Sequence, residues 1–287
     1  MVNYLRSSAG FRATTVCVIQ SLPPRDVATG VELVGYIKSI ADEHQFNVEF
    51  ANCIGADSFL DKLKELEIRA SNGEIPILHV ECHGCPLDGL CFADGTTLDW
   101  DNLSLAILPI NVETGFNLLV VFSACYGAYM LSQTNPEIRS PFWGLVGPTK
   151  RVPVPEVMSG FKTFYRFLIS TGSLTEAKRE LQTLKLPEGE WLVATAELFY
   201  EVTIRNFIKK HCSAAAIKKS TKIYIKNLKS GKASKCHGSP QKHVRKLIRE
   251  SLCGPYFDKY FCIDIHPGST TRFESSRLVI CELSRSI

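Results

Sequence analysis

A histidine and a cysteine stand just beyond two apolar segments of this chain. His83 follows the apolar run 75–80, and Cys125 follows the run 118–122. Such runs predict buried strands, and open α/β sheets hold their ligand sites at the edge where the strands end. A thiolate attacks a carbonyl carbon while an imidazole manages the proton. We therefore expect His83 and Cys125 to converge as the nucleophile and base of a cysteine protease.

Strand and helix patterns alternate over the first 200 residues around these two positions. Strands are predicted at 15–20, 46–50, 75–80, 118–122 and 142–146. Apolar residues at helical spacing predict helices within 31–41, 59–66, 103–107 (ending before Pro109) and 157–168. Asp94-Gly95 predicts a hairpin between 87–92 and 96–98, a Pro-rich loop is expected at 152–155, and Ser173 begins a capping box. The alternation predicts an α/β fold of three layers with a mostly parallel central sheet.

Charge is distributed unevenly along the chain. The net charge is +4, yet residues 205–249 hold 14 lysines and arginines and no acidic residue. The rest of the chain is therefore acidic. We expect one domain over 1–204 and a smaller basic accessory domain over 205–287, with strand-like pieces at 260–265 and 278–283.

The two chemical motifs together resemble a known family. His83-Gly84 is followed 42 residues later by Ala124-Cys125, with a glycine at 127, and this order resembles the caspase-like (clan CD) cysteine peptidases. Ser123 stands where caspases have glutamine, which looks closer to the CHAT-type domains related to caspases and separase. The aromatic segment from Phe142 and the Glu-Ala pair at 176–177 are similar to that branch, so the resemblance spans roughly residues 12 to 185.

The resemblance implies a caspase-like sandwich and a division of labour among four groups. Cys125 would be the nucleophile, and His83 would assist proton transfer to the leaving amine. The N–H groups of Gly84 and Cys125 would form the oxyanion hole, with glycine leaving room for the substrate backbone. No third acid, metal or cofactor is implied. The family also implies cleavage of one dedicated protein, latency until a protein or ligand activates the enzyme, and, in a bacterial source, a defence or cell-death role.

Substrate specificity is open at this level. Relatives that cut after arginine or lysine hold an acidic residue two positions before the cysteine, where this chain has Ser123. A buried cation needs a carboxylate partner, so a strong basic preference is placed in doubt. Asp26 and Asp88, in loops expected near the crevice, are the candidates that would restore acidity, and the sequence does not choose between them.

Other interpretations of these residues are weaker. Cys82, His83 and Cys85, with Cys91 nearby, have zinc-ligand spacing, but a matching second pair is missing. A redox role for Cys82 and Cys85 is weaker still, since no helix begins after the pair. His79 lies inside its predicted strand and is expected to be a hydrogen-bonded core histidine.

The basic segment allows a second class of function. Its lysines are expected to form a solvated face or a protein contact, with nucleic acid the less favoured partner. Only Tyr224 interrupts the densest part, which is a poor platform for stacking single strands. The alternative to the protease is a non-catalytic α/β scaffold that binds nucleic acid or an acidic protein through this segment.

Composition favours a globular intracellular protein. Apolar residues make up 45% of the chain, no run approaches the ~18 apolar residues of a membrane helix, and the start does not resemble a cleaved signal. Eleven cysteines without regular spacing argue against a secreted disulfide framework. We expect a cytoplasmic protein with reduced thiols and no membrane partner.

Overall fold

A mostly parallel sheet forms the centre of the first of the two units into which the chain divides. The computed structural model describes residues 5–6, 11–41, 47–133, 135–184, 191–234 and 238–287. Its six main strands run in the order β10-β9-β8-β5-β3-β4, all parallel to their neighbours except the edge strand β10. They are β3 (Thr15–Ser21), β4 (Asn47–Asn52), β5 (Pro76–Cys85), β8 (Leu119–Phe122), β9 (Gly144–Pro148) and β10 (Trp191–Thr195).

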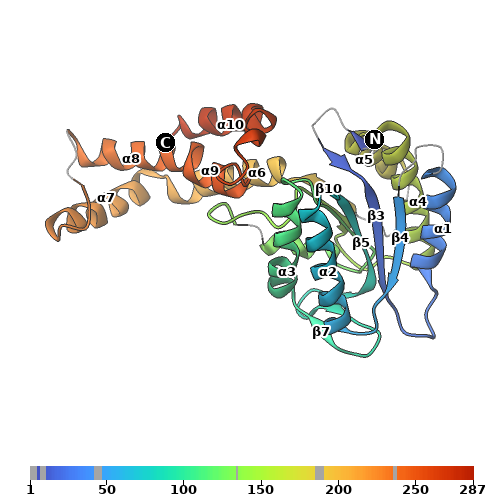
Figure 1. The fold of residues 1–287 in the computed structure, drawn as a ribbon. Helices are drawn as coiled ribbons and strands as arrows, with labels where there is room; N and C mark the ends of the chain where they lie inside the picture. Colours follow the sequence, from blue (N-terminus) through green and yellow to red (C-terminus); the bar gives the residue numbers. More distant parts are fainter. Residues whose placement is uncertain (1–4, 7–10, 42–46, 134, 185–190, 235–237) are drawn as a thin grey trace. The chain divides into compact units, whose positions relative to one another are not determined.

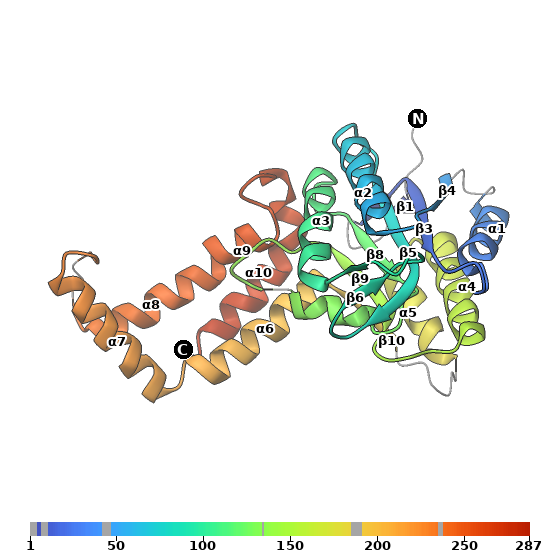
Figure 2. The same cartoon turned by 90° about the horizontal axis from the view of Figure 1, so that it is seen from below.

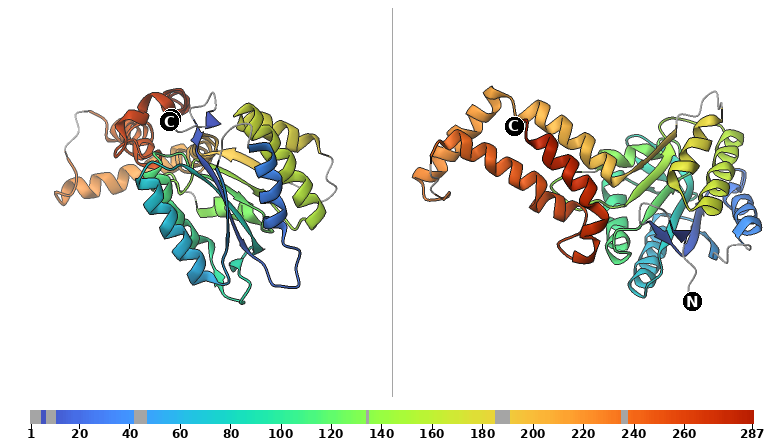
Figure 3. Two further views of the ribbon diagram at one scale, coloured as in Figure 1. Left: turned by 45° about the vertical axis from the view of Figure 1, so that its right-hand side comes forward. Right: turned by 90° about the horizontal axis from the view of Figure 1, so that it is seen from above.

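Helices cover both faces of this sheet, as Figures 1 and 3 show for the first unit. Helices α2 (Ala56–Ser71) and α3 (Trp100–Glu113) lie together on one face. Helices α1 (Thr29–Ala41), α4 (Val154–Thr171) and α5 (Leu174–Thr183) lie on the other. The predicted α/β class with a mostly parallel sheet is confirmed.

Local sequence accounts for most of these elements. All seven residues of β3 are buried, as expected for a central parallel strand covered on both faces. Strands β6 (Gly89–Cys91) and β7 (Thr97–Leu98) form the antiparallel hairpin predicted around Asp94-Gly95. Ser173 caps α5 by accepting a hydrogen bond from the Glu176 N–H. A two-stranded pair of β1 (Leu5–Arg6) and β2 (Arg12–Ala13) precedes the sheet.

Three local predictions differ from the structure. Helix α3 continues through Pro109 instead of ending before it, because Ile107 and Ile110 on either side of the proline are both buried. The loop predicted at 152–155 is half helical, since Val154 and Pro155 begin α4. Proline is tolerated in this first turn because a backbone N–H there has no partner within the helix. Of the strand predicted at 46–50, residue 46 lies outside the described residues, and β4 begins at Asn47.

The second unit consists of residues 135–140 and 196–287, and its described residues form helices joined by turns and loops, with no strand. Its helices are α6 (Ala196–His211), α7 (Ala214–Lys229), α8 (Pro240–Cys253), α9 (Pro255–Tyr260) and α10 (Thr270–Ser284), and Figure 2 shows them from below. The division falls at Ala196, and α6 runs through the boundary expected between residues 204 and 205.

The strands predicted at 260–265 and 278–283 are wrong. Residues 261–265 form turns after α9, and 278–283 lie within α10. Phe257, Tyr260, Phe261 and Phe273 instead form an aromatic core around Tyr200. Their side chains point inward from helices, and a short apolar run is compatible with either kind of element.

Two general features concern the described residues of both units. None of their helices is both long and apolar enough to cross a membrane. Each described cysteine is a free thiol.

Candidate active site

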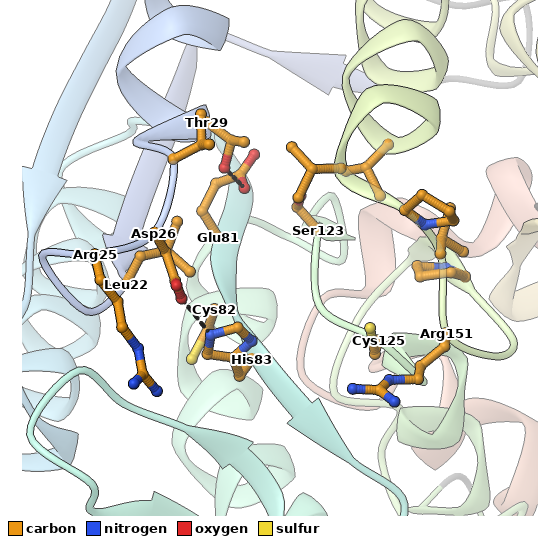
Figure 4. Close-up of a pocket in the computed structure, with 16 residues that line it drawn as sticks. Leu22, Arg25, Asp26, Thr29, Glu81, Cys82, His83, Ser123, Cys125 and Arg151 are labelled. Carbon is orange, nitrogen blue, oxygen red and sulfur yellow. Dashed lines mark hydrogen bonds and ion pairs between the residues drawn. The ribbon is translucent and has the colours of Figure 1, made fainter.

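His83 and Cys125 line one pocket at the end of two neighbouring parallel strands. Val80 of β5 pairs with Phe122 of β8, so each of the two residues lies three positions beyond this shared register. The pocket has a volume of ≈ 560 Å³ and is lined by residues of the first unit alone. The strand geometry thus brings the predicted imidazole and thiol to one cavity (Figure 4).

Asp26 holds the imidazole of His83. Its Oδ2 lies 2.7 Å from His83 Nε2, and the His83 side chain is 56% exposed. In Figure 4, Asp26 lies on one side of the His83 ring and Cys125 on the other. Asp26 comes from the loop between β3 and α1, at the same edge of the sheet. A carboxylate in this place orients the ring, a role that the sequence analysis did not assign to Asp26.

A strained turn carries Cys125. Tyr126, directly after it, has a φ of 63°, which is uncommon for a residue with a side chain. Gly127 then opens the 3₁₀ helix η2 (Gly127–Gln133), and a Cβ at Gly127 would overlap Phe122. Backbone strain of this kind costs about 1–3 kcal/mol and is concentrated at functional sites.

The structure gives another reason for glycine at position 84 than the predicted room for the substrate backbone. A Cβ at Gly84 would overlap the carbonyl oxygen of Cys125, so glycine is needed for the two strand ends to approach, whether or not substrate is present. The backbone N–H of Cys125 donates to no described residue. That N–H is therefore available for an oxyanion, as the predicted role of Cys125 requires.

Ser123 lies on the wall of the pocket, two residues before Cys125. Its N–H donates to the Val80 carbonyl at 2.8 Å, which extends the β5–β8 pairing by one bond. Its Oγ is buried without a hydrogen-bond partner among the described residues. Figure 4 shows Ser123 above Cys125, on the side of α4.

A buried polar row lies beneath His83 on the same face of β5, where residues alternate with a period of two. His79 is 0% exposed, and its ring contacts Tyr165 Oη through Nδ1 at 2.9 Å and Glu81 Oε1 through Nε2 at 3.0 Å. The Thr29 hydroxyl donates to the other Glu81 oxygen at 2.6 Å. Burial raises the pKa of Tyr165 well above its usual value, so the phenol stays protonated. This row confirms His79 as a core histidine and was otherwise missed.

The charges on the pocket wall fall into two groups. Both carboxylates are already paired, Asp26 with His83 and Glu81 with His79 and Thr29. Arg25 and Arg151 also line the pocket, from the loops that follow β3 and β9, and neither makes a hydrogen bond or ion pair with a described residue. The charged groups that line the cavity without a hydrogen-bond partner among the described residues are therefore both cations.

Asp88, a predicted pocket position, lies apart from this arrangement, whereas Cys82 lines the pocket. Asp88 is exposed, accepts a hydrogen bond from the Cys85 thiol at 3.2 Å, and does not line the pocket. The Cys82 thiol contacts the Cys91 carbonyl, and burial raises its pKa. Among the described residues, no three or more His, Cys, Asp and Glu side chains gather to hold a metal ion.

Comparison with known proteins adds no family to this geometry, because neither the protein-family models nor the curated proteins searched include a match to the chain. The sequence analysis missed three residues of the pocket wall, Arg25, Glu81 and Arg151. Arg25 and Arg151 follow predicted strands at the same sheet edge as Cys125, and Glu81 is two residues from His83.

Proposed function

We propose that this chain is a cysteine endopeptidase with a caspase-like fold that cuts a protein substrate through Cys125 and His83. The observation that carries the proposal is the shared pocket: a thiol and a carboxylate-bound imidazole line one cavity at adjacent strand ends. A core role alone does not require a cysteine with a free N–H, a strained residue after it and an oriented histidine beside it. Together these features match the groups that acyl transfer needs, which are a nucleophile, a donor to the oxyanion and a carrier of the proton.

The first half of the reaction forms a thioester. The Cys125 sulfur, once deprotonated, attacks the scissile carbonyl carbon and the carbonyl becomes a tetrahedral oxyanion. The Cys125 N–H is positioned to donate to that oxygen, a contribution of roughly 3–4 kcal/mol for such a donor in other enzymes. When the C–N bond breaks, protonated His83 gives its proton to the departing amine, and Asp26 stabilises the imidazolium before this transfer.

The second half restores the enzyme with water. His83, now neutral, takes a proton from a water molecule, whose oxygen attacks the thioester. The C–S bond breaks, the acid product leaves, and Cys125 regains its thiolate. His83 and Cys125 are not hydrogen-bonded to each other. Their separation is compatible with a latent enzyme in which an activating protein or ligand closes the site, since catalytic hydrogen bonds often tighten only in the complex.

The pocket charges favour an acidic substrate side chain at the cleavage site. Asp26 and Glu81 are both hydrogen-bonded, so Arg25 and Arg151 are the only charged groups among the described lining residues that lack a hydrogen-bond partner. A guanidinium binds a carboxylate through two parallel hydrogen bonds, which gives both energy and geometry. An incoming lysine or arginine would meet two like charges, so the basic preference considered from the sequence is disfavoured.

Cysteine reactivity tests the dyad directly. We expect limiting iodoacetamide to alkylate Cys125 of the folded protein at neutral pH before it alkylates the buried thiols. The rate should fall by about tenfold or more in His83→Ala. Cys17 and Cys82 serve as internal controls, because burial raises the pKa of both thiols and keeps them unreactive. Alkylation of Cys125 that is indifferent to His83, with and without cell extract as a source of activator, would overturn the proposal.

Peptide cleavage then tests the substrate class. The protein and extract are incubated with two peptide pools that differ at one position. One pool holds aspartate or glutamate there, and the other holds lysine or arginine. We expect the acidic pool to be cut faster, and Arg151→Gln to reduce that preference by about ten- to a hundredfold, the value of a lost charged contact of ~1.5–3 kcal/mol. Equal cleavage of both pools by the unaltered protein rejects the acidic preference but leaves the dyad standing.

A further inference from the structure

Helix α7 presents a row of lysines on one side. Lys218, Lys219, Lys222, Lys226 and Lys229 are all exposed. At 3.6 residues per turn they fall within a sector of about 100°, and the row is about 16 Å long. None of the five ammonium groups makes a hydrogen bond or an ion pair with a residue that the structure describes. We call these five residues the lysine face.

The opposite side of α7 is occupied by the neighbouring helix. Ile217 is buried, and the Tyr224 ring lies 5.1 Å from the ring of His243 in α8. Figures 2 and 3 show α7 and α8 side by side. The lysine face is therefore left to solvent by the fold of its own unit, and no acidic residue from 205 to 249 offsets its charge.

The two arginines of α8 are bound differently. Arg245 donates to the carbonyl of Ile287, and Arg249 donates to the carbonyl of Arg285 at 3.4 Å. These cations hold the C-terminal residues against α8. The contrast separates the α7 lysines, which make no such contact, from the two α8 arginines, which hold part of the fold.

We propose that the lysine face binds duplex nucleic acid through its phosphates, without reading sequence. Duplex DNA carries one negative charge per about 1.7 Å of axis, so a row of compact cations meets phosphates along its whole length. The ring of Tyr224 is held against His243, which leaves the face without an aromatic platform for single strands. The binding site is independent of the pocket in the first unit.

A membrane surface fits this face less well. The exposed apolar residues beside it, Ile223 and Ile225, are 54% and 36% exposed. Helical geometry places one on each side of the lysine sector and neither in its centre. A helix that inserts into a bilayer needs a continuous apolar face, and here that face is packed on α8. An acidic protein remains the competing partner, and the experiment includes it.

The test compares two variants with equal loss of charge. Lys218→Gln, Lys222→Gln and Lys226→Gln are combined in one full-length chain. The matched control combines Lys38→Gln, Lys64→Gln and Lys259→Gln, three exposed lysines elsewhere. Glutamine keeps helix propensity, and the helical circular dichroism signal checks folding. Binding of a labelled duplex of about 20 base pairs is measured by fluorescence anisotropy over a salt series from about 0.05 to 0.3 M.

We expect the unaltered protein to bind with a slope of log K against log salt near −4.5 if all five lysines contact phosphates. The α7 variant should flatten that slope by about 2.7 and weaken binding by a hundredfold or more at ~0.1 M salt. The control and Cys125→Ala should retain both the slope and the affinity. Equal loss in the two triple variants, no binding at low salt, or tighter binding of polyglutamate or anionic lipid vesicles than of duplex would each overturn the proposal. These outcomes leave the cysteine reactivity result untouched.

Discussion

Two histidines on strand β5 are four residues apart on one face, yet they occupy opposite environments. His79 is 0% exposed and contacts a protein partner through each ring nitrogen. His83 has a side chain that is 56% exposed and one nitrogen bound, to Asp26. Glu81 lies between them, is 1% exposed and lines the pocket. Its two carboxylate oxygens contact His79 and the Thr29 hydroxyl.

The difference lies in what each ring can exchange. A buried histidine with both nitrogens bonded is fixed in one protonation pattern, because any change would leave a buried polar group without a partner. An exposed histidine with one free nitrogen can gain or lose a proton at small cost. The depth of a position along the strand therefore decides whether both ring nitrogens are bound or only one, and the side-chain type does not.

Glu81→Ala is the variant expected to have the largest effect on this contrast. Removing the carboxylate leaves His79 Nε2 and the Thr29 hydroxyl buried without their acceptor, so we expect a loss of about 3–5 kcal/mol in the free energy of unfolding. Urea denaturation followed by tryptophan fluorescence measures it, since Trp100, Trp143 and Trp191 all lie in the first unit and report on it alone.

His83→Ala is the matched control for that experiment. Its side chain is largely exposed, so the same unfolding midpoint should shift by no more than about 0.5 kcal/mol in equivalent free energy. If Glu81→Ala proves no more destabilising than His83→Ala, the buried row does not support the sheet and the comparison fails.

An intermediate effect is expected from Asp26→Asn. The asparagine keeps the size of the side chain but loses the negative charge beside His83, so under the proposed mechanism alkylation of Cys125 should slow by about ten- to a hundredfold. Asp88→Asn removes an exposed carboxylate that lies outside the pocket and should leave the rate unchanged. A rate that falls equally in both variants points to a general charge effect and argues against orientation of His83 by Asp26.

The smallest effect concerns an ion pair near the surface. Hydrogen bonds from Arg139 lower the pKa of Asp264, with Oδ1 2.6 Å from Nη1, but the Asp264 side chain is 40% exposed. Arg139→Gln should return that pKa toward the ordinary aspartate value, observed by NMR titration of the carboxyl group. The pKa of Asp264 is lower in the folded than in the unfolded protein. The ion pair therefore stabilises the fold at pH values above the ordinary aspartate pKa, and this stabilisation disappears as the pH falls through the lowered pKa.

Solvent limits the size of this last effect. At neutral pH we expect Arg139→Gln to lose about 0.2–1 kcal/mol of stability, and the two proteins to become equally stable in acid. Arg285→Gln, which removes a cation paired with Glu282, is the control and should leave the Asp264 titration in place. A loss as large as that of Glu81→Ala would mean that pairing, not burial, sets the cost.

Much of the first unit could be predicted from the sequence. Its strands are short runs between turn residues, and its helices show periodic apolar positions, so local pattern and tertiary structure agree. The meeting of His83 and Cys125 at one pocket was expected from their positions directly after two apolar, strand-like runs. The hairpin at Asp94-Gly95 followed from turn chemistry.

The remaining features depended on long-range contacts. Residues 278–283 look strand-like, but in α10 Ile280 is buried while Leu278 and Val279 stay exposed, a pattern that only the packed helices decide. The role of Asp26 required knowing that its loop returns to β5. Glu81 was passed over because an acidic residue inside an apolar strand has meaning only once its buried partners are known.

The assignment of residues 135–140 to the helical unit has a consequence for dividing the gene. The chain leaves the α/β unit after residue 134, returns at 141 and leaves again at 196. Within the helical unit, the Ser140 N–H donates to the Tyr260 carbonyl at 3.1 Å, and Arg139 holds Asp264. A stop codon at the apparent boundary would therefore delete the partners of an internal segment encoded between Cys125 and β9. The two units are not separable modules in the genetic sense, and shuffling or truncation must carry both coding regions together.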